Sequence, residues 1–115
     1  MEEAMRFDKN KNKLSLISPL AIEAMGRVLT FGAAKYEEHN WRKGMKWSKS
    51  LNSLKRHLLE FEKCNDKDEE SGELHMAHVI VNAMFLIEYY YTHPELDDRF
   101  RIKEDKPKHY NDKTN

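Results

Sequence analysis

Residues 73–91 read ELHMAHVIVNAMFLIEYYY, and this segment indicates the fold more strongly than any other part of the chain. On a helical wheel, one side of this segment is apolar and carries Met76, Ile80, Ala83 and Ile87. The nearly opposite side carries His75, His78, Asn82 and Tyr89. A helix with so little charge on either side is normally buried. We therefore expect a helix over residues 73–91 inside a bundle. Because one small chain can hardly cover it, we expect a second subunit against it.

Two further helices are predicted before this one. Ser18 and Pro19 form a typical helix start, with serine as N-cap and proline at the first helical position. This helix should cover about residues 19–31, with residues 33–38 able to continue it, and its apolar positions are Leu20, Ala24, Val28 and Phe31. A second helix is expected at about residues 50–63, with an apolar stripe of Leu51, Leu54, Leu58 and Phe61. Since the polar turn that follows is short, the second and third helices should be antiparallel neighbours. The predicted fold class is all-α, a small antiparallel helical bundle.

The composition limits the class of protein. The chain has 115 residues and a mass of 13.7 kDa, which suits one domain over residues 1–115, with a polar arm at about 1–13 and a charged tail at about 97–115. Its 20 Lys and Arg residues balance 20 Asp and Glu residues, which argues against a general nucleic-acid binder. The longest apolar run is far shorter than the roughly 20 residues that span a bilayer. The single cysteine, Cys64, is typical of a reducing compartment. We expect a soluble, cytoplasmic protein that binds neither nucleic acid nor membrane.

Polar side chains on the inner faces of two helices form a first candidate site. His57 and Glu60 are three residues apart, as are His75 and His78, so each pair projects together from its helix. The turn between the helices adds carboxylates at Asp66, Asp68, Glu69 and Glu70. Carboxylates and imidazoles that converge inside a bundle are typical of a metal site. The alternative is that the histidines are hydrogen-bonded core or interface residues, and that the acidic run only stabilises the start of the third helix.

A loop rich in cations and aromatic residues forms a second candidate site. The cations suited to phosphate are Lys35, Arg42, Lys43 and Lys46. The aromatic faces on which a base could stack belong to Tyr36, Trp41 and Trp47. The alternative is a solvated charged loop with the tryptophans packed beneath it. Cations, aromatic faces and metal-binding carboxylates together indicate a nucleotide. The P-loop pattern and the His-Asp dipeptide are absent, so the enzymes that depend on them are not expected.

Several of these motifs together resemble the dATP/dGTP diphosphohydrolase family. They are LTFGAAKY at residues 29–36, NWRKG at 40–44, RHL at 56–58, DEESG at 68–72, and then His75, His78 and Asn82. Their order and spacing agree with the family over about residues 13–90. Members of the family are small proteins, frequent in phage genomes and allied to the all-α, MazG-like nucleotide pyrophosphatases.

The resemblance implies hydrolysis of a purine deoxynucleoside triphosphate, dATP or dGTP, to the monophosphate and pyrophosphate. It also implies a MazG-like fold, a divalent metal and a homo-oligomer, either a dimer or a tetramer, in the host cytoplasm if the chain is phage-encoded. The MazG-like class carries Glu-x-x-Glu on one helix and Glu-x-x-Asp on the next. At the corresponding places this chain has His57-x-x-Glu60 and His75-x-x-His78.

Candidate roles follow for the metal and for the chemistry. The metal, Mg²⁺ with Mn²⁺ or Co²⁺ as substitutes, is expected on Glu60, Asp68 and Glu70, joined by His57 or His78. Water would attack the α-phosphorus and expel pyrophosphate. The group that takes the proton from that water is expected among His57, Glu60 and His78.

The substrate itself is expected to contact six side chains, namely Lys35, Tyr36, Asn40, Trp41, Arg56 and Asn82. Lys35 and Arg56 would hold phosphate. Trp41 would stack on the base, and Asn40, which has both a donor and an acceptor, would read its edge. Asn82 would either bind substrate or orient a neighbouring histidine. The main alternative is a non-catalytic nucleotide-binding or regulatory helical oligomer, and a second is a helical interaction protein that uses the third helix only for assembly.

Overall fold

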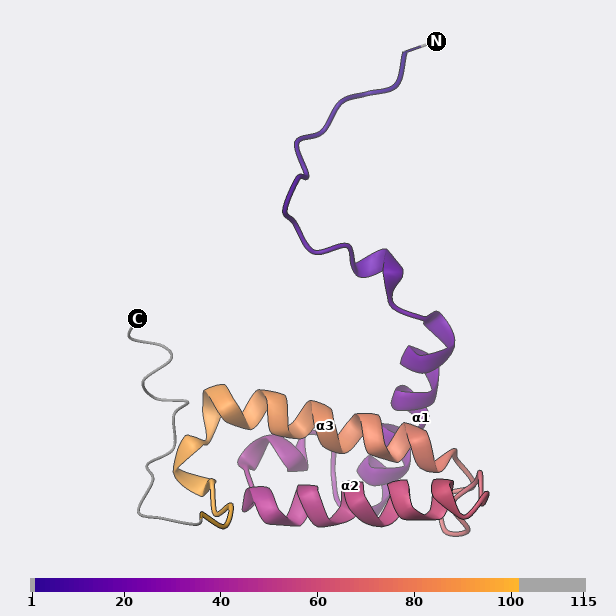
Figure 1. Cartoon of the computed structure of the whole chain (residues 1–115), viewed down its shortest axis with the longest axis vertical. Helices are drawn as coiled ribbons and strands as arrows, with labels where there is room; N and C mark the ends of the chain where they lie inside the picture. Colours follow the sequence, from indigo (N-terminus) through magenta and orange to yellow (C-terminus); the bar gives the residue numbers. More distant parts are fainter. Residues whose placement is uncertain (1, 102–115) are drawn as a thin grey trace.

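The computed structural model describes residues 2–101, and this part of the chain consists of helices and loops (Figure 1). Its helices are α1 (Pro19–Lys35), α2 (Trp47–Glu62) and α3 (His75–Thr92). Short 3-10 turns precede, link and follow them as η1 (Leu14–Leu16), η2 (Asn40–Lys43) and η3 (Pro94–Leu96). Within residues 2–101 there is no strand, only an isolated bridge between Lys67 and Leu74. The all-α fold predicted from the sequence is confirmed.

Helix α1 begins where the sequence predicts because Ser18 caps it. The Oγ of Ser18 accepts a hydrogen bond at 3.3 Å from the backbone N–H of Ala21, and Pro19 occupies the first turn. The helix then continues through Gly32 to Lys35, past its expected end at about residue 31. A glycine lowers helix stability without ending the helix. The longer helix brings Lys35 to the turn before α3, where its side chain binds a carboxylate.

Helix α2 begins at Trp47, earlier than the predicted Ser50, and its N-terminus is capped by a distant residue. Lys46, at the N-cap position, makes no side-chain cap. Instead, the Asp98 carboxylate accepts hydrogen bonds from the backbone N–H of Ser48 at 2.9 Å and from its hydroxyl at 2.6 Å. These bonds hold the pKa of Asp98 below its usual range. A carboxylate at this position also faces the positive end of the helix dipole.

The segment that holds this cap is itself ordered by charge pairs. The Asp97 side chain is fully buried and accepts hydrogen bonds from Arg99 at 2.9 Å and Arg101 at 3.1 Å. The Arg99 guanidinium lies 5.0 Å from the centroid of the Trp47 ring. The first residues of the expected charged tail therefore pack against the helices, and residues 102–115 lie outside the described part of the chain.

Helix α3 contacts both other helices. It runs antiparallel beside α2, as the short turn predicts, and α1 crosses behind it (Figure 1). The hydrophobic core joins Ala24 and Val28 of α1 to Ala77 and Val81 of α3, each no more than 7% exposed. Apolar side chains packed against this core are Met25, Leu29 and Phe85. On another side of α3, its polar groups contact α2, with His75 beside His57 and Asn82 bonded to Ser53.

Large apolar side chains remain exposed on two parts of the chain. Residues 2–17 extend away from the helices (Figure 1), and the exposed apolar side chains there include Met5, Phe7, Leu14 and Leu16. On the helices, exposed apolar side chains include Leu59, Phe61, Ile87 and Tyr91. The side of α3 that we expect a second subunit to cover is thus partly open, and the oligomer stays a prediction. Within residues 2–101, no helix combines the length and the hydropathy needed to cross a membrane.

Candidate functional site

A pocket of about 880 Å³ opens between the end of α1, the η2 loop, α2 and α3. Its lining includes most of the side chains singled out from the sequence, namely Lys35, Tyr36, Asn40, Trp41, Arg56, His57, Asp68, Glu70, His78 and Asn82. Glu60 does not line it. Ligand pockets of proteins commonly measure about 300–1,000 Å³. The fold therefore gathers residues that are far apart in sequence around one space of ligand size.

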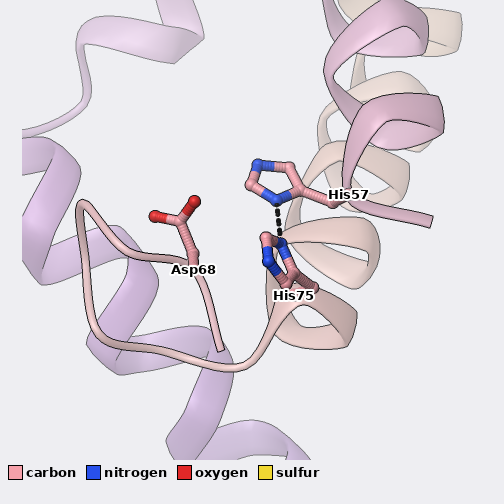
Figure 2. Close-up of side chains that lie close together, drawn as sticks. All are labelled: His57, Asp68 and His75. Carbon is pink, nitrogen blue, oxygen red and sulfur yellow. Dashed lines mark hydrogen bonds between the residues drawn. The ribbon is translucent and has the colours of Figure 1, made fainter. Parts of the chain in front are cut away.

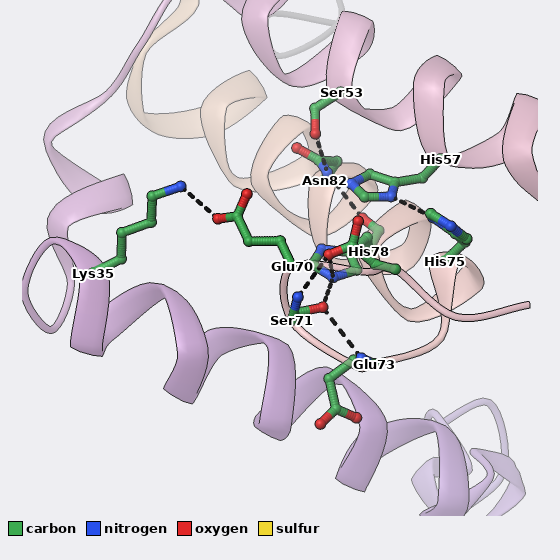
Figure 3. A network of polar contacts seen from close by, with 10 residues as sticks. Lys35, Ser53, His57, Glu70, Ser71, Glu73, His75, His78 and Asn82 are labelled. Atoms are coloured by element: carbon green, nitrogen blue, oxygen red, sulfur yellow. Dashed lines mark hydrogen bonds and ion pairs between the residues drawn. The ribbon is translucent and has the colours of Figure 1, made fainter.

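Three histidines meet where α2 faces the start of α3. The Nδ1 atoms of His57 and His75 are 2.8 Å apart, and the ring of His57 stacks on that of His78 with centroids 4.2 Å apart and planes 8° from parallel (Figure 3). Burial, helped by the nearby His78, lowers the pKa of His57 to about 4. Burial also lowers the pKa of His78. Near neutral pH these two rings are therefore uncharged, with a lone pair each to offer.

Asp68 is held beside the histidines by the turn between α2 and α3. The Asp68 carboxylate accepts a hydrogen bond from the backbone N–H of Ser71 at 2.9 Å. The turn is closed by backbone bonds from Asp68 to Glu73 and from His75 to Asp66, both 2.8 Å long. Burial acts to raise the pKa of Asp68, but the hydrogen bonds from Ser71 and the nearby histidines outweigh it, so the pKa is lowered. The carboxylate is thus fixed in place and ionised.

One carboxylate and two imidazoles converge at the edge of the pocket, where His57 and Asp68 line it and His75 does not. His57, Asp68 and His75 each offer one ligand atom, and these three atoms lie within 4.8 Å of one another (Figure 2). His75 is only 6% exposed. His78 stands at the edge of the group, with its Nε2 3.8 Å from the Asp68 carboxylate. We refer to His57, Asp68 and His75 as the converging triad. This triad has the donor atoms and the spacing to hold a metal ion.

Two serines, which the sequence analysis gave no role, hold the polar groups in position. The hydroxyl of Ser71 lies 2.7 Å from Nε2 of His78 and accepts a hydrogen bond at 3.2 Å from the backbone N–H of Glu73. The Asn82 amide donates to the hydroxyl of Ser53 at 3.1 Å and to the carbonyl of His78 at 2.9 Å (Figure 3). Ser71 could have been found in the sequence, because it lies between two helices in a segment with Asp68 and Gly72, and Asp, Ser and Gly are typical turn residues.

The other two predicted metal ligands are each paired with a lysine. Glu70 accepts a hydrogen bond from Lys35 at 2.7 Å across the pocket (Figure 3). Glu60 accepts from Lys63 at 2.9 Å and from the Asn65 amide at 3.1 Å. Neither carboxylate belongs to the converging triad. His75, which the sequence analysis grouped with His78 without a role of its own, takes the central place.

The far end of the pocket is aromatic. Trp41 stacks on Phe85 with ring centroids 4.6 Å apart, and the Arg42 guanidinium lies 4.5 Å from the centroid of Trp41. Arg42 also pairs with Glu88 at 2.7 Å, and the hydroxyl of Tyr89 donates to the carbonyl of Trp41 at 2.6 Å. Phe85 and Glu88 were not among the site residues predicted from the sequence. Helical spacing could have found Phe85, since it is three residues after Asn82 on the histidine-bearing side of α3.

The second tryptophan is part of the core. Trp47 is 5% exposed, and its indole N–H donates to the carbonyl of His93 at 3.1 Å. For Trp47, the alternative of a tryptophan packed beneath a charged loop is therefore correct. Asn40, Trp41 and Tyr36 all line the pocket. Tyr36 is 66% exposed.

Fold and site together define a small all-α protein whose pocket carries histidines, carboxylates and cations beside a potential metal position. The comparison with known proteins then identifies the family. Residues 1–99 match the family described as dATP/dGTP diphosphohydrolase, N-terminal, and the chain belongs to this family. The resemblance seen in the sequence motifs is confirmed.

A relative from Salmonella phage PMBT28, named dATP/dGTP diphosphohydrolase, is 43% identical over 95 residues. The matched region is 83% of this chain but 32% of that protein, so the chain spans about a third of its relative. No solved structure matches the chain.

Proposed function

We propose that this chain hydrolyses purine deoxynucleoside triphosphates, dATP and dGTP, to the monophosphate and pyrophosphate with the help of a divalent metal. One observation carries the proposal: a pocket of about 880 Å³ combines cations and aromatic side chains with His57 and Asp68, two members of a group with the donor set of a metal site. The name of the phage relative supports the substrate class. The exposed apolar surfaces of α3 and of the arm support the expected homo-oligomer.

A nucleotide fits this pocket with its triphosphate beside Asp68 and its base beside Glu88. From His78 to Glu88 helix α3 advances ten residues, which is about 15 Å at 1.5 Å per residue. Lys35 and Arg56 lie on the lining where they can hold phosphate oxygens. At the other end, Trp41 and the Arg42–Glu88 pair offer an aromatic edge together with donors and acceptors for a purine.

The reaction then needs attack by water on the α-phosphorus and departure of pyrophosphate. The water oxygen bonds to the α-phosphorus, the bond from that phosphorus to the bridging oxygen breaks, and the water proton passes to a base. His78 suits this role among the three candidates, because it lines the pocket, burial lowers the pKa of its imidazole, and its Nε2 lies 2.7 Å from the Ser71 hydroxyl and 3.8 Å from the Asp68 carboxylate. Glu60 does not line the pocket, and His57 belongs to the converging triad. A bound divalent metal would neutralise the triphosphate and lower the pKa of water.

Lys35 supplies the positive charge that stabilises the phosphate oxygens as negative charge grows on the leaving group. Its present partner is Glu70, which also raises the pKa of Lys35, and both side chains are largely exposed. A triphosphate is a stronger partner than one carboxylate, so substrate would draw the ammonium group toward itself. Arg56 is a second cation on the same lining.

The alternative is a non-catalytic nucleotide-binding or regulatory helical oligomer. It is favoured by the observation that the chain spans about a third of its relative, whose activity need not reside in that third. Pyrophosphate release from dATP, dGTP and two pyrimidine triphosphates, with and without metal, tests the proposal. Metal-dependent release from the purine nucleotides is expected. Binding of dGTP without release of pyrophosphate would instead establish the alternative.

A further inference from the structure

We propose that the metal position at the edge of this pocket selects a transition ion, of the Mn²⁺ to Zn²⁺ series, held by His57, Asp68 and His75, and that it is not a magnesium site built from Glu60, Asp68 and Glu70. The inference goes beyond the proposed reaction, because it concerns which ion the chain binds and through which atoms. It holds or fails independently of whether a nucleotide is hydrolysed.

The distances suit a common ion. Two ligand atoms bound to one ion at about 2.0–2.2 Å stand roughly 3 Å apart when they occupy neighbouring positions. The Nδ1 atoms of His57 and His75 are already 2.8 Å apart, and the Asp68 carboxylate lies within 4.8 Å of them. The three ligand atoms are therefore close enough together to share one ion.

The chemistry of the donors determines the class of ion. Magnesium prefers oxygen ligands and keeps several of its waters, whereas imidazole suits zinc, iron, nickel and similar ions. Two of the three converging donors are imidazole nitrogens. Two histidines with one carboxylate also leave open positions, as in catalytic metal sites, and these positions can take water or phosphate oxygens.

The surroundings keep the imidazoles available as ligands. His75 is 6% exposed, and its Nδ1 faces another imidazole nitrogen, so at most one proton is shared between two ring nitrogens. A metal ligand must be unprotonated. Two imidazole nitrogens that already face each other at 2.8 Å are thus placed to share one cation.

The carboxylate of the triad is positioned before any ion arrives. The backbone N–H of Ser71 binds the Asp68 carboxylate at 2.9 Å, and the backbone N–H of His75 binds the carbonyl of Asp66 at 2.8 Å. These two bonds tie the loop that carries Asp68 to the first turn of α3, which carries His75. By contrast, Glu60 and Glu70 would have to leave Lys63 and Lys35 before either could bind an ion.

Cobalt and zinc binding to the full chain, freed of metal, tests the proposal directly. Co²⁺ should give visible d–d absorption typical of nitrogen ligation, Zn²⁺ should raise the melting temperature, and millimolar Mg²⁺ should displace neither ion. His57→Gln, His75→Gln and Asp68→Asn should each weaken Co²⁺ binding by at least about tenfold. Glu60→Gln and Glu70→Gln should change it by less than about twofold, and Glu69→Gln, in the same turn, serves as the matched control.

Far-UV circular dichroism of each variant separates loss of a ligand from loss of the fold. If His75→Gln does not fold, the half-buried His57 and the turn residue Asp68 still carry the test. The proposal is overturned if Co²⁺ shows no band beyond that of the aqueous ion, if Mg²⁺ competes, or if Glu60→Gln and Glu70→Gln abolish binding while His57→Gln does not. Pyrophosphate release without such a site would overturn this inference and leave the proposed function standing. A nitrogen-bound ion without release of pyrophosphate would support this inference and contradict the proposed function.

Discussion

Tyr89→Phe should destabilise the chain by about 1–3 kcal/mol, because it removes one partner of a buried hydrogen bond and leaves the other in place. Tyr89 is fully buried, and its hydroxyl donates to the backbone carbonyl of Trp41 at 2.6 Å. Phenylalanine keeps the ring contacts with Trp41 and Phe85, whose centroids are 6.3 and 6.4 Å away. The carbonyl oxygen, however, loses its partner. The change therefore isolates the bond that fixes the η2 loop on α3.

The assays are urea unfolding and thermal melting, both followed by far-UV circular dichroism, since the fluorescence of Trp41 responds to the substitution itself. For a domain of about 100 residues, 1 kcal/mol corresponds to roughly 4 °C in melting temperature, so a fall of about 4–12 °C is expected. Tyr36→Phe is the matched control. It removes the same hydroxyl from a side chain that is 66% exposed, and it should stay within about 0.5 kcal/mol of wild type. A Tyr89→Phe variant as stable as this control would refute the reasoning.

The same variant has a pH signature. Burial raises the pKa of Tyr89 to about 12, whereas tyrosine in an unfolded chain titrates near about 10. Because the folded-state pKa is the higher one, the stabilising contribution is complete below about pH 10 and is lost as the pH rises through about 12. The advantage of wild type over Tyr89→Phe should therefore shrink between about pH 10 and pH 12. A constant difference across that range would show that the hydroxyl is not buried as described.

Three further predictions concern other parts of the chain. Lys35→Ala should lower kcat/KM by a similar factor for all nucleotides, about tenfold to a hundredfold, because all of them carry phosphate. Steady-state kinetics check this, and a change confined to one base would contradict it. Asp98→Ala should lower the melting temperature by removing the cap on Ser48, with Asp98→Asn closer to wild type, and equal melting curves for both would argue against a capping role. Gly44→Ala should lower the free energy of unfolding by about 1–3 kcal/mol, since Gly44 has φ of 93° and a Cβ there would lie 2.9 Å from the His93 ring. Urea unfolding checks this, and an unchanged midpoint would contradict it.

The parts of the fold that local sequence determines were predictable. Ser18 and Pro19 set the start of α1, and the alternation of apolar and polar faces over residues 73–91 indicates a buried α3. The start of α2 was not predictable, because the carboxylate that caps it belongs to Asp98, 50 residues beyond Ser48. A cap supplied by tertiary structure leaves no mark in the local sequence.

The candidate site was likewise predictable only in part. The spacing of His75 and His78 and the acidic turn indicated a cluster, and the fold brings it together around Asp68. The pairing of His57 with His75 depends on how far α2 is shifted along α3, which helical periodicity does not determine. Charge alone made Glu60 and Glu70 equal candidates to Asp68, and only their lysine partners in the fold distinguish them.

Hydrolysis in ¹⁸O-labelled water tests the central claim most directly, because it follows the attacking oxygen. The full chain, supplied with dGTP and a divalent metal, should yield the monophosphate with one labelled oxygen and unlabelled pyrophosphate. Asp68→Asn, folded by circular dichroism, should yield neither above background. The account is contradicted if wild type produces no pyrophosphate, if the label enters pyrophosphate rather than the monophosphate, or if Asp68→Asn turns over as fast as wild type.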